Sequence, residues 1–562
     1  MSSEISSAAT LARQSLFVSL TIMVSRVLGL LRDVALVWCF SAAAWMLDAF
    51  YFAFTLPNLL RNLLGEGALT AAFIPEFVRA DNSQRARLAG AVITWLLVGV
   101  GGITLLGSLG CFFAASLADL GAQWHLTLIL LVVTLPFAAL ICCSAILGAI
   151  LQCLKVFVLP AAMSCLLNLF IIGVVLAATY RGGEFANNLT ADQLVTLAQL
   201  AATAVTAAGA AQLLIQYPVI RARGVRLKPA FAVDATLKKI WHNFLPAAVG
   251  LGVVQLNSLL DNLLAYGLSL GYFGFAAAGA TTYLFLGNRL MQLPLGVFAL
   301  AAATTAFPTL AALAAKNDLA GLRQTVTESL RRLGFIMLPA AAGLIVLAKP
   351  LVECLYQAPD LRFTDAAVYR TTAVLVCLAA ALPLFGAIHL FTRAFYALGD
   401  YRTPVRIALQ TVGVNLVGNL LLPFAPDLYR QYYHLDYAGL SPHLGEAGLA
   451  LSTMLCACLN ALRLWRALAK KLPPVADTEN GKSKSGTFGM LISAVGMAVV
   501  TYYIVRSVPY GPEFIYRLER VVAGVGGGIA AYGIFASTFC AEDYENFFAR
   551  WRKKRGEGKV KS

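Results

Sequence analysis

Long apolar runs recur along the whole chain and alternate with short polar connections. Each run holds about 20 residues, the length that an α-helix needs to span the hydrocarbon core of a bilayer. We count about fourteen such runs, with centres near Leu28, Phe52, Val98, Leu131, Phe170, Val205, Val253, Phe285, Leu344, Leu378, Leu416, Met454, Ala494 and Gly526. The pattern predicts an all-α polytopic membrane protein with about fourteen transmembrane helices.

The composition agrees with this class. Of the 562 residues, 59% are hydrophobic and 13% are charged, whereas soluble proteins carry about 25% charged residues. The connections between the runs hold no large water-soluble domain, so we do not expect an ATP-driven pump. The 11 cysteines are scattered, lie mostly in apolar runs and lack zinc-site spacing, so we interpret them as packing residues.

The formal net charge of +15 raises the question of a nucleic-acid partner, but the positions of the charges indicate membrane topology instead. Lys and Arg gather in every second connection, as in Arg79–Arg87, Arg221–Lys239 and Arg463–Lys471, and again in Arg550–Arg555. The alternate connections, such as Leu117–His125, are poor in both. By the positive-inside rule this predicts cytoplasmic termini, an even number of spans and no nucleic-acid binding. The polar start Met1–Thr10 shows no cleavable signal, so we expect the first helix to stay as an anchor.

Two composition shifts divide the chain into six spans, six spans and two. A basic connector, Arg221–Asp234, follows the sixth predicted span, and a polar one, Pro473–Gly486, follows the twelfth. We therefore predict an N-terminal lobe over residues 1–228, a C-terminal lobe over 229–472, a polar cytoplasmic linker over 473–486, a helix pair over 487–540 and a basic amphipathic cytoplasmic tail over 541–562. Carriers built from such halves bind their cargo where the halves meet.

Four arginines interrupt the apolar runs: Arg26, Arg32, Arg61 and Arg289. A Lys or Arg near the centre of a membrane helix costs roughly 2.5 to 3.5 kcal/mol, so four facing lipid would cost on the order of 10 kcal/mol. They must instead face a water-filled cavity, a partner or an anionic cargo. Because a guanidinium stays charged and binds phosphate oxygens through a planar fork, several together suit a diphosphate.

Other polar residues accompany these arginines in the same runs. The candidate substrate-binding neighbours are Ser25, Asp48, Glu66 and Asn288. Residues that permit a bend or a close helix approach make a second group, and we predict hinges at Gly29, Pro57 and Pro294.

An alternative interpretation is that the arginines are neutralised within the protein. Arg32 has Asp33 next to it and Asp48 in the following run, while Arg61 has Glu66 nearby. Such pairs fix helix register without any cargo. A charge count favours cargo, because four arginines stand against three acids in these segments.

Milder polar groups interrupt two further runs. Asp261 lies in the seventh, and Asn415 and Asn419 share one face of the eleventh at a spacing of i, i+4. We propose these three as candidate residues for coupling to a monovalent cation, sodium or proton. The alternative is that the asparagines make hydrogen bonds between helices.

The sequence holds none of the enzyme motifs that we sought. H-E-x-x-H, G-x-x-x-x-G-K-[ST] and G-x-S-x-G are absent, and the five histidines are widely separated. We therefore predict a transporter that is not an enzyme, without cofactor or resident metal, driven by an ion gradient, the membrane potential or the cargo's own gradient.

Several longer motifs are similar to those of one known family, the MurJ/MviN lipid II flippases of the multidrug, oligosaccharidyl-lipid and polysaccharide exporter superfamily. They are Ser25-Arg26-Val27-Leu28-Gly29, Arg32-Asp33, Asp48-Ala49-Phe50, Leu56–Arg61, Gly65–Ala68, Asn288–Gly296 and Arg393–Val405. The resemblance runs from the first predicted span to the twelfth, while the last two spans match mainly by position. It implies fourteen helices in two six-helix lobes plus a final pair.

The resemblance also implies an activity. Lipid II, the undecaprenyl-diphosphate disaccharide-pentapeptide precursor of peptidoglycan, would move from the inner to the outer leaflet of the bacterial cytoplasmic membrane for cell-wall synthesis. Membrane lipids and the cell-wall synthesis enzymes are the other implied partners. The resemblance places the four arginines, Asp48 and Ser25 at the family's cavity positions. It also implies that the last two helices, from about Phe488 to Cys540, line a groove for the lipid tail.

Some positions depart from the family pattern. Asn419 replaces an aspartate of the sodium-binding members, which puts sodium coupling in doubt. Asn288 and Gln292 stand where members carry acids, and Thr55 stands where some carry a lysine.

Three other function classes are weaker. A cation-coupled drug exporter of the same superfamily would need acids in place of the arginines. A membrane glycosyltransferase would need a catalytic external loop, for which Asp427, Asp436 and Glu446 offer little. A flippase for another undecaprenyl-diphosphate glycan has similar head-group chemistry and stays open.

Overall fold

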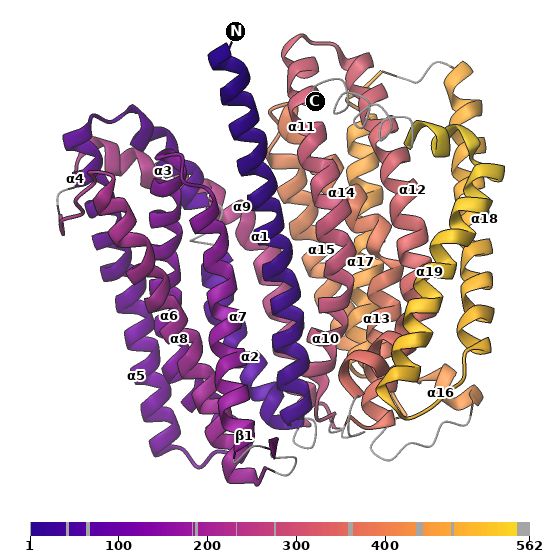
Figure 1. The fold of residues 1–562 in the computed structure, drawn as a ribbon, viewed down its shortest axis with the longest axis horizontal. Helices are drawn as coiled ribbons and strands as arrows, with labels where there is room; N and C mark the ends of the chain where they lie inside the picture. The colour runs from indigo at the N-terminus through magenta and orange to yellow at the C-terminus, as the bar shows by residue number, and fades with distance from the viewer. Residues whose placement is uncertain are drawn as a thin grey trace. The chain divides into compact units, whose positions relative to one another are not determined.

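The chain folds almost entirely into helices in a computed structural model (Figure 1). The structure describes residues 2–40, 44–62, 68–181, 184–185, 189–231, 233–274, 277–357, 363–433, 442–473 and 477–547. Helices follow directly from the apolar runs, since a membrane span must satisfy its backbone hydrogen bonds within itself. The predicted all-α class is therefore confirmed, and among the described residues the only strands are two short ones.

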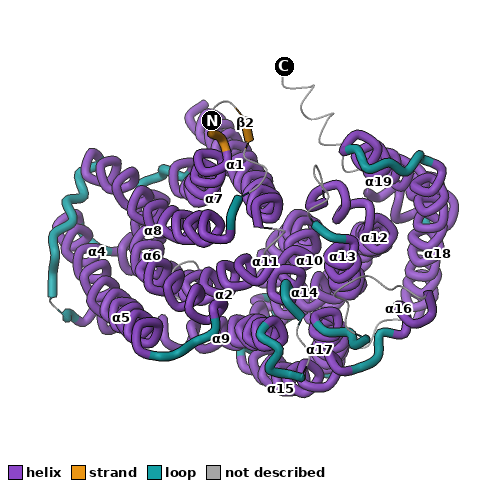
Figure 2. The backbone as a smooth tube through the Cα atoms, turned by 90° about the horizontal axis from the view of Figure 1, so that it is seen from below, coloured by secondary structure: helices purple, strands orange, loops and turns teal. Residues whose placement is uncertain are grey.

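The chain divides into two compact units, residues 1–282 and 283–562. The first contains α1 (Ser2–Phe40), α2 (Ala44–Leu60), α3 (Ala68–Arg79), α4 (Asn82–Leu96), the π-helix η3 (Leu97–Gly101), α5 (Gly102–Leu117), α6 (Ala122–Cys153), α7 (Val158–Thr179), β1 (Tyr180–Arg181), β2 (Glu184–Phe185), α8 (Ala191–Ala222) and α9 (Ala235–Ser269). The strands β1 and β2 pair antiparallel. Helix α6 packs against α2, α5 and α8, and Figure 2 shows α6 beside α8.

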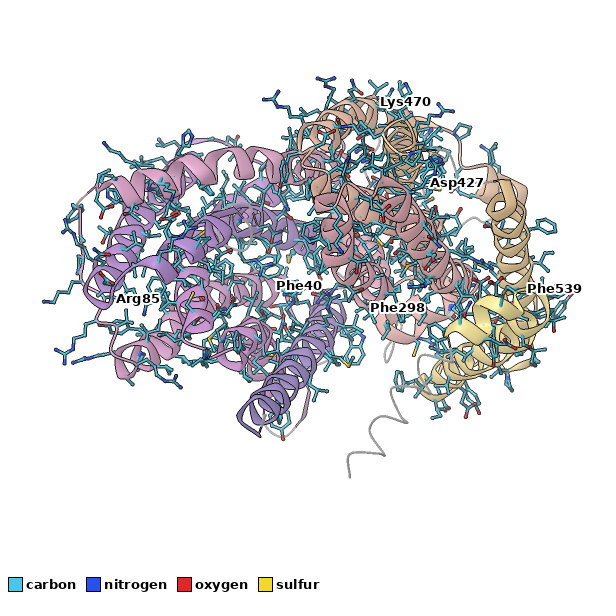
Figure 3. The ribbon with its side chains drawn as sticks, turned by 90° about the horizontal axis from the view of Figure 1, so that it is seen from above. Phe40, Arg85, Phe298, Asp427, Lys470 and Phe539 are labelled. Atoms are coloured by element: carbon cyan, nitrogen blue, oxygen red, sulfur yellow. The ribbon has the colours of Figure 1, made fainter. Side chains whose placement is uncertain are left out.

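The second unit takes in most of α10 (Ala280–Pro294), whose first turn belongs to the first unit. It continues through η4 (Leu295–Ala299), α11 (Leu300–Ala315), α12 (Leu319–Val352), η5 (Glu353–Gln357), α13 (Asp365–Ala380), α14 (Leu382–Ala397), α15 (Arg402–Leu421), η6 (Leu422–Phe424), α16 (Leu428–Tyr433), α17 (Glu446–Ala469), α18 (Asp477–Ser507) and α19 (Phe514–Phe539). The pair α18–α19 packs along α12 (Figure 1). Phe539, labelled in Figure 3, ends α19.

Each unit has its own apolar core. Phe73, Phe77 and Ile146 lie in one apolar cluster of the first unit, and Phe391 and Phe395 lie in one of the second. Polar side chains close several helix ends, as where the Thr190 hydroxyl accepts from the Gln193 backbone N–H and the Gln193 side chain accepts in return. This capping box satisfies backbone groups that a helix start leaves unpaired.

Nine helices in the described part are long and apolar enough to cross a membrane, or ten if the bent pair α13–α14 counts as one span. They correspond to predicted spans three to six and nine to fourteen. The other four predicted spans are one, two, seven and eight, which include residues that the structure does not describe. These spans hold all the candidate site residues except Asn415 and Asn419. The total of fourteen stays a prediction.

The compact units differ from the predicted lobes in the placement of α9. The predicted boundary follows residue 228, yet α9 lies in the unit that ends at Thr282, because it packs against α2 and α3. The predicted division of the chain thus stays a prediction. The predicted linker over 473–486 is largely helical where it is described, since α18 begins at Asp477. Most of the predicted tail over 541–562 lies outside the described residues.

Candidate functional site

Arg32 on α1 is buried and makes an ion pair with its neighbour Asp33. The Arg32 Nε and Nη2 atoms donate to Asp33 Oδ1 over 2.9 and 2.6 Å, and Asp33 is fully buried. The guanidinium also lies 5.8 Å from the centre of the Phe54 ring on α2. Of the alternatives raised by the sequence, pairing of Arg32 with Asp33 is therefore confirmed. Arg32 does not add a net positive charge to this part of the membrane.

Asn168 on α7 also contacts Arg32, and the sequence reasoning missed it. Its Oδ1 accepts from Arg32 Nη1 over 3.2 Å, while its Nδ2 donates to the backbone oxygen of Ser25 over 3.1 Å. One amide thus joins α7 to α1 at both Ser25 and Arg32. The available signal was a lone asparagine in the fifth apolar run, because buried amides in membrane helices usually bridge helices.

Replacing Asp33 by asparagine is expected to lower the free energy of unfolding by about 3 kcal/mol, because it leaves a buried guanidinium without its counter-charge. Thermal denaturation of the purified protein in detergent measures the effect. The control is Glu328→Gln, which breaks the half-exposed pair of Glu328 with Arg332 and should change stability by less than about 0.5 kcal/mol. Equal effects of the two substitutions would contradict the structural role assigned to Asp33.

Arg26 differs from Arg32 in its surroundings. It is half-buried on α1, and within the described part of the chain it forms no hydrogen bond or ion pair. Arg61 is also half-buried and is held by two amides, donating to Asn58 Oδ1 over 3.1 Å and to Asn62 Oδ1 over 3.2 Å. Both amide oxygens accept hydrogen bonds from the guanidinium and so orient it.

Helix geometry places Arg26 and Arg61 at a similar depth. The connection between α1 and α2 covers only residues 41–43, so the two helices run in opposite directions. Arg32 lies level with Phe54. At 1.5 Å per residue, Arg26 is about 9 Å from that level along α1 and Arg61 is about 10 Å along α2, both towards the same side of the membrane.

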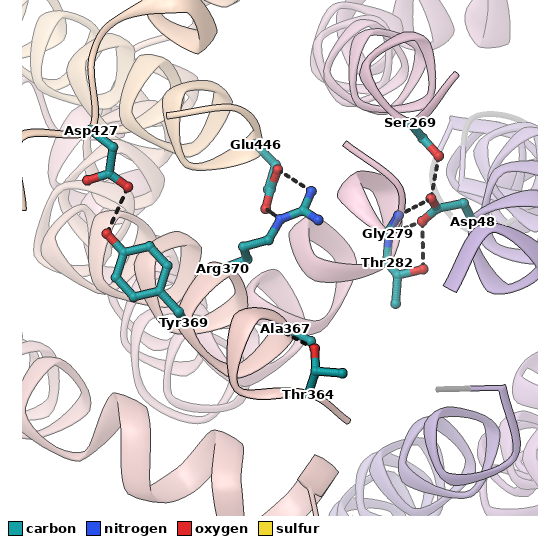
Figure 4. A network of polar contacts seen from close by, with 10 residues as sticks. All are labelled: Asp48, Ser269, Gly279, Thr282, Thr364, Ala367, Tyr369, Arg370, Asp427 and Glu446. Carbon is teal, nitrogen blue, oxygen red and sulfur yellow. Dashed lines mark hydrogen bonds and ion pairs between the residues drawn. The ribbon is translucent and has the colours of Figure 1, made fainter. Parts of the chain in front are cut away.

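Asp48 is fully buried on α2, and its carboxylate accepts four hydrogen bonds (Figure 4). Oδ2 accepts from Ser269 Oγ at 2.5 Å and from the Gly279 backbone N–H at 2.7 Å. Oδ1 accepts from the Thr282 backbone N–H at 2.8 Å and from its hydroxyl at 2.7 Å. Asp48 therefore caps the start of α10 from another helix, satisfying backbone groups that have no acceptor within α10.

Further contacts fasten the same end of α9. Gln123 Nε2 on α6 donates to Ser269 Oγ over 2.9 Å, and Thr127 shares a hydrogen bond with the Tyr266 hydroxyl. The Tyr266 ring stacks on Phe52 of α2 with centroids 4.3 Å apart. We call the contacts of Asp48, Gln123, Ser269, Tyr266 and Thr282 the α9 tie. It could not be predicted from the sequence, since its partners are far apart along the chain.

Arg289 and Asn288 lie near the middle of α10 in the second unit, and both are half-buried.

Pro294 ends α10, and the backbone continues directly as the π-helix η4. A π-turn at this place marks a change of hydrogen-bond register, as proline requires. Pro57, in contrast, is buried inside an uninterrupted α2. Gly29 is buried on α1, and Glu66 lies outside the described residues.

The candidate cation residues have different surroundings. Asp261 is half-buried on α9 and accepts from Asn257 Nδ2 over 3.4 Å. Asn415 and Asn419 are buried on α15, and Ser452 on α17 donates to both Asn415 oxygens, at 3.1 Å to the backbone and 2.8 Å to the side chain. Asn415 thus makes the interhelical hydrogen bond named as the alternative. Among the described residues, no three His, Cys, Asp or Glu side chains gather as a metal site.

The motif Arg393–Val405 forms the turn between α14 and α15. Asp400 caps α15 by accepting from the Thr403 backbone N–H at 3.0 Å, and it pairs with Lys471 at the end of α17. Partial burial acts to raise the pKa of Asp400, but the bonds from Lys471 and Thr403 outweigh it and hold the pKa below its usual range. The motif therefore joins three helices of the second unit at one end.

Comparisons with known proteins agree with these features. The sequence model of the family "Lipid II flippase MurJ" matches residues 40–518. The "Probable lipid II flippase MurJ" of Haemophilus influenzae is 29% identical over 86% of this chain and 91% of its own length. The protein of the same description from Vibrio cholerae is 30% identical over 83% and 84%. The "Lipid II flippase MurJ" of Burkholderia cenocepacia is 27% identical over 82% and 84%.

Solved structures agree in fold. The structure "Lipid II flippase MurJ, inward closed conformation" superposes with a TM-score of 0.69 at 21% identity, covering 94% of this chain and 99% of its own. An inward-facing multidrug resistance transporter of the MATE family follows at 0.55 and 14% identity, covering 81% and 98%. Since the family model covers most of the sequence, the chain belongs to the MurJ lipid II flippase family, whose members are membrane transporters and not enzymes.

Proposed function

We propose that this protein carries lipid II from the inner to the outer leaflet of the bacterial cytoplasmic membrane for peptidoglycan synthesis. Membership of the flippase family supports the activity. The observation that carries it to this chain is Arg26, a guanidinium in an apolar helix that no described side chain neutralises. A charge in that position is stabilised by an anionic cargo, and the diphosphate of lipid II supplies one.

The arginines then have distinct roles. Arg26 and Arg61, at similar depth on antiparallel helices, bind the diphosphate, and Asn58 and Asn62 orient Arg61. Arg32, already paired with Asp33, fixes α1 against α7 through Asn168 and adds hydrogen-bond donors more than net charge. Arg289, beside Asn288, supplies the cation of the C-terminal lobe.

Transport proceeds by alternating access. By the predicted topology, the α9 tie lies at the outer end of the helices, so it closes that end while lipid II enters from the cytoplasmic side. Release outside requires Asp48 to separate from Gly279 and Thr282. Gly29, Pro57 and Pro294 are the proposed hinges, and the π-helix directly after Pro294 supports that position.

A driving force is needed because the cargo can bias the two states only by its differential affinity for them. A negative-inside potential favours outward movement of negative charge by about 2.3 kcal/mol per charge per 100 mV. Coupling to sodium or a proton through Asp261, Asn415 and Asn419 is the other proposal. We place both termini in the cytoplasm and expect the cell-wall synthesis enzymes as protein partners.

Depletion of the protein with a chase of labelled precursor tests the function. The expected result is that the disaccharide-pentapeptide lipid accumulates at the cytoplasmic face, where a hydrolase added outside the cell does not reach it. Restoring the protein should restore access to the hydrolase. Normal export of lipid II during depletion, with accumulation of another prenyl-linked glycan, would assign the protein to that glycan instead.

A further inference from the structure

Arg517 in the first turn of α19 is almost fully buried yet poorly bonded. Its side chain is 2% exposed, and the only hydrogen bond that it donates in the described structure runs from Nη1 to the backbone oxygen of Glu353, over 3.4 Å. Its Nε has no partner. A guanidinium has five N–H donors, so this charge is buried with most of its donors unused.

Two more cations lie around Glu353, the first residue after α12. Arg520 Nη1 is 3.5 Å from Glu353 Oε2, and Lys349 Nζ is 3.7 Å from Glu353 Oε1. The Arg520 guanidinium also stacks on the Tyr510 ring, 5.0 Å from its centre. We call Lys349, Glu353, Arg517 and Arg520 the α12–α19 cluster.

The charges of this cluster do not cancel. Three cations surround Glu353, and Asp365, which bonds to Gln357 Nε2 over 2.9 Å, is the next acid in its field. Glu513 and Glu519 on the same helix are exposed. With the buried Glu353 and the exposed Asp365 set against three cations, the cluster keeps one positive charge in excess. Neither Lys349 nor Arg520 is fully covered, with side chains 61% and 17% exposed.

The position of the cluster identifies the kind of anion. Glu353 begins η5, the last turn of the apolar span Leu319–Gln357, and Arg517 lies in the first turn of the span Phe514–Phe539. Both helix ends therefore meet one membrane–water boundary, the level of lipid phosphates. A planar guanidinium held over an aromatic ring is suited to a phosphate.

We propose that the α12–α19 cluster binds the phosphate group of a membrane lipid at this boundary. The site is separate from the arginines of α1 and α2 and does not depend on the proposed transport. Two lipids supply that chemistry, an anionic phospholipid and a prenyl diphosphate. Lys349 and Arg520 contact the phosphate. Arg517, buried beneath them, makes the electrostatic potential at the phosphate more positive.

Native mass spectrometry of the full-length protein in detergent tests the site, with phosphatidylglycerol and farnesyl diphosphate as probes and inorganic diphosphate as the lipid-free comparison. Arg517→Gln is expected to weaken lipid binding about tenfold, because it removes one buried positive charge from beneath the phosphate. The farnesyl diphosphate titration is repeated with the Arg26→Ala protein, in which binding near α1 is weakened. The binding that remains is then assigned to the α12–α19 cluster. The lipid that binds more tightly identifies the natural source.

Two further variants separate binding from structure. Arg506→Gln removes an exposed cation of α18 that bonds only to Tyr502 in the described structure, and its affinity should stay within about twofold of wild type. Glu353→Gln removes the central acid and should strengthen binding severalfold, opposite to Arg517→Gln. Weaker binding in Glu353→Gln, or equal affinities of the Arg517→Gln and Arg506→Gln proteins, would overturn the proposal.

Discussion

Replacing Arg26 by alanine is expected to abolish lipid II transport while the protein still folds and inserts. Arg26 makes no bond within the described structure, so its loss removes nothing that holds α1 in place. A lost bidentate contact with a diphosphate costs about 3 kcal/mol, or roughly a hundredfold in affinity. Export of labelled lipid II, measured by its access to an added hydrolase, reports the defect.

Arg32→Ala and Arg332→Ala make this experiment specific. Arg32→Ala removes a buried partner of Asp33, so transport and thermal stability should both fall. Arg332→Ala removes a half-exposed cation of α12 and should change neither. If Arg26→Ala exported lipid II at the wild-type rate, or unfolded as readily as Arg32→Ala, the cargo-binding role of Arg26 would be wrong.

Replacing Asp48 by asparagine is expected to loosen the contacts between α2 and the start of α10 and to reduce transport by at least about tenfold. The amide keeps the size of the side chain but replaces one carboxylate oxygen by an NH2 group, so two of the four donors lose their acceptor. Hydrogen bonds to a charged acceptor are worth about 1.5–3 kcal/mol each. A loss of about 3 kcal/mol shifts the ratio of two states roughly a hundredfold, which depopulates the state that accepts lipid II from inside.

Hydrogen exchange measures the α9 tie directly. The backbone N–H groups of Gly279 and Thr282 lie at the start of α10, where no acceptor exists within the helix, so their protection depends on Asp48. Exchange in the peptide that contains both should rise at least tenfold in Asp48→Asn. Asp119→Asn, an exposed acid before α6, is the matched control. Unchanged exchange in Asp48→Asn would contradict the capping role.

The helical fold could be predicted from the sequence because membrane spans leave a strong periodic signal. The apolar runs from Gln84 to Ala222 and from Leu319 to Phe539 correspond to helices of suitable length. The division between units could not be predicted in the same way. Helix α9 lies with the first unit because of side-chain contacts such as that between Tyr266 and Phe52. The charge-rich connector Arg221–Asp234 does not indicate these contacts.

Some candidate site residues could be named for the same reason. A lone arginine in an apolar run is visible in sequence, so Arg26, Arg32, Arg61 and Arg289 could be named. Of their partners, Asp33 could be named because it is adjacent to Arg32, but Asn168 could not, because pairing depends on rotamers and on residues far along the chain. Arg32 pairs with its neighbour, while Asn168 reaches it across 136 positions.

Asp48 and Arg517 show two further limits of reasoning from sequence. The sequence placed Asp48 among the cargo-binding residues, yet all four of its described bonds go to the α9–α10 region. A carboxylate that caps a distant helix has no local motif. Arg517 lies at the edge of an apolar run, where a cation ordinarily costs little free energy because its side chain reaches water. Only its burial in the structure distinguishes it from other such cations.

Affinity for lipid II is the measurement that tests most directly whether membrane-embedded guanidinium groups hold the diphosphate. The purified wild-type protein and the Arg26→Ala/Arg61→Ala double variant are titrated with lipid II in lipid nanodiscs. Arg332→Ala, which removes one half-exposed cation of α12, is the control. We predict binding at least about a hundredfold weaker in the double variant and unchanged binding in Arg332→Ala. Equal affinity of the wild type and the double variant would contradict the account.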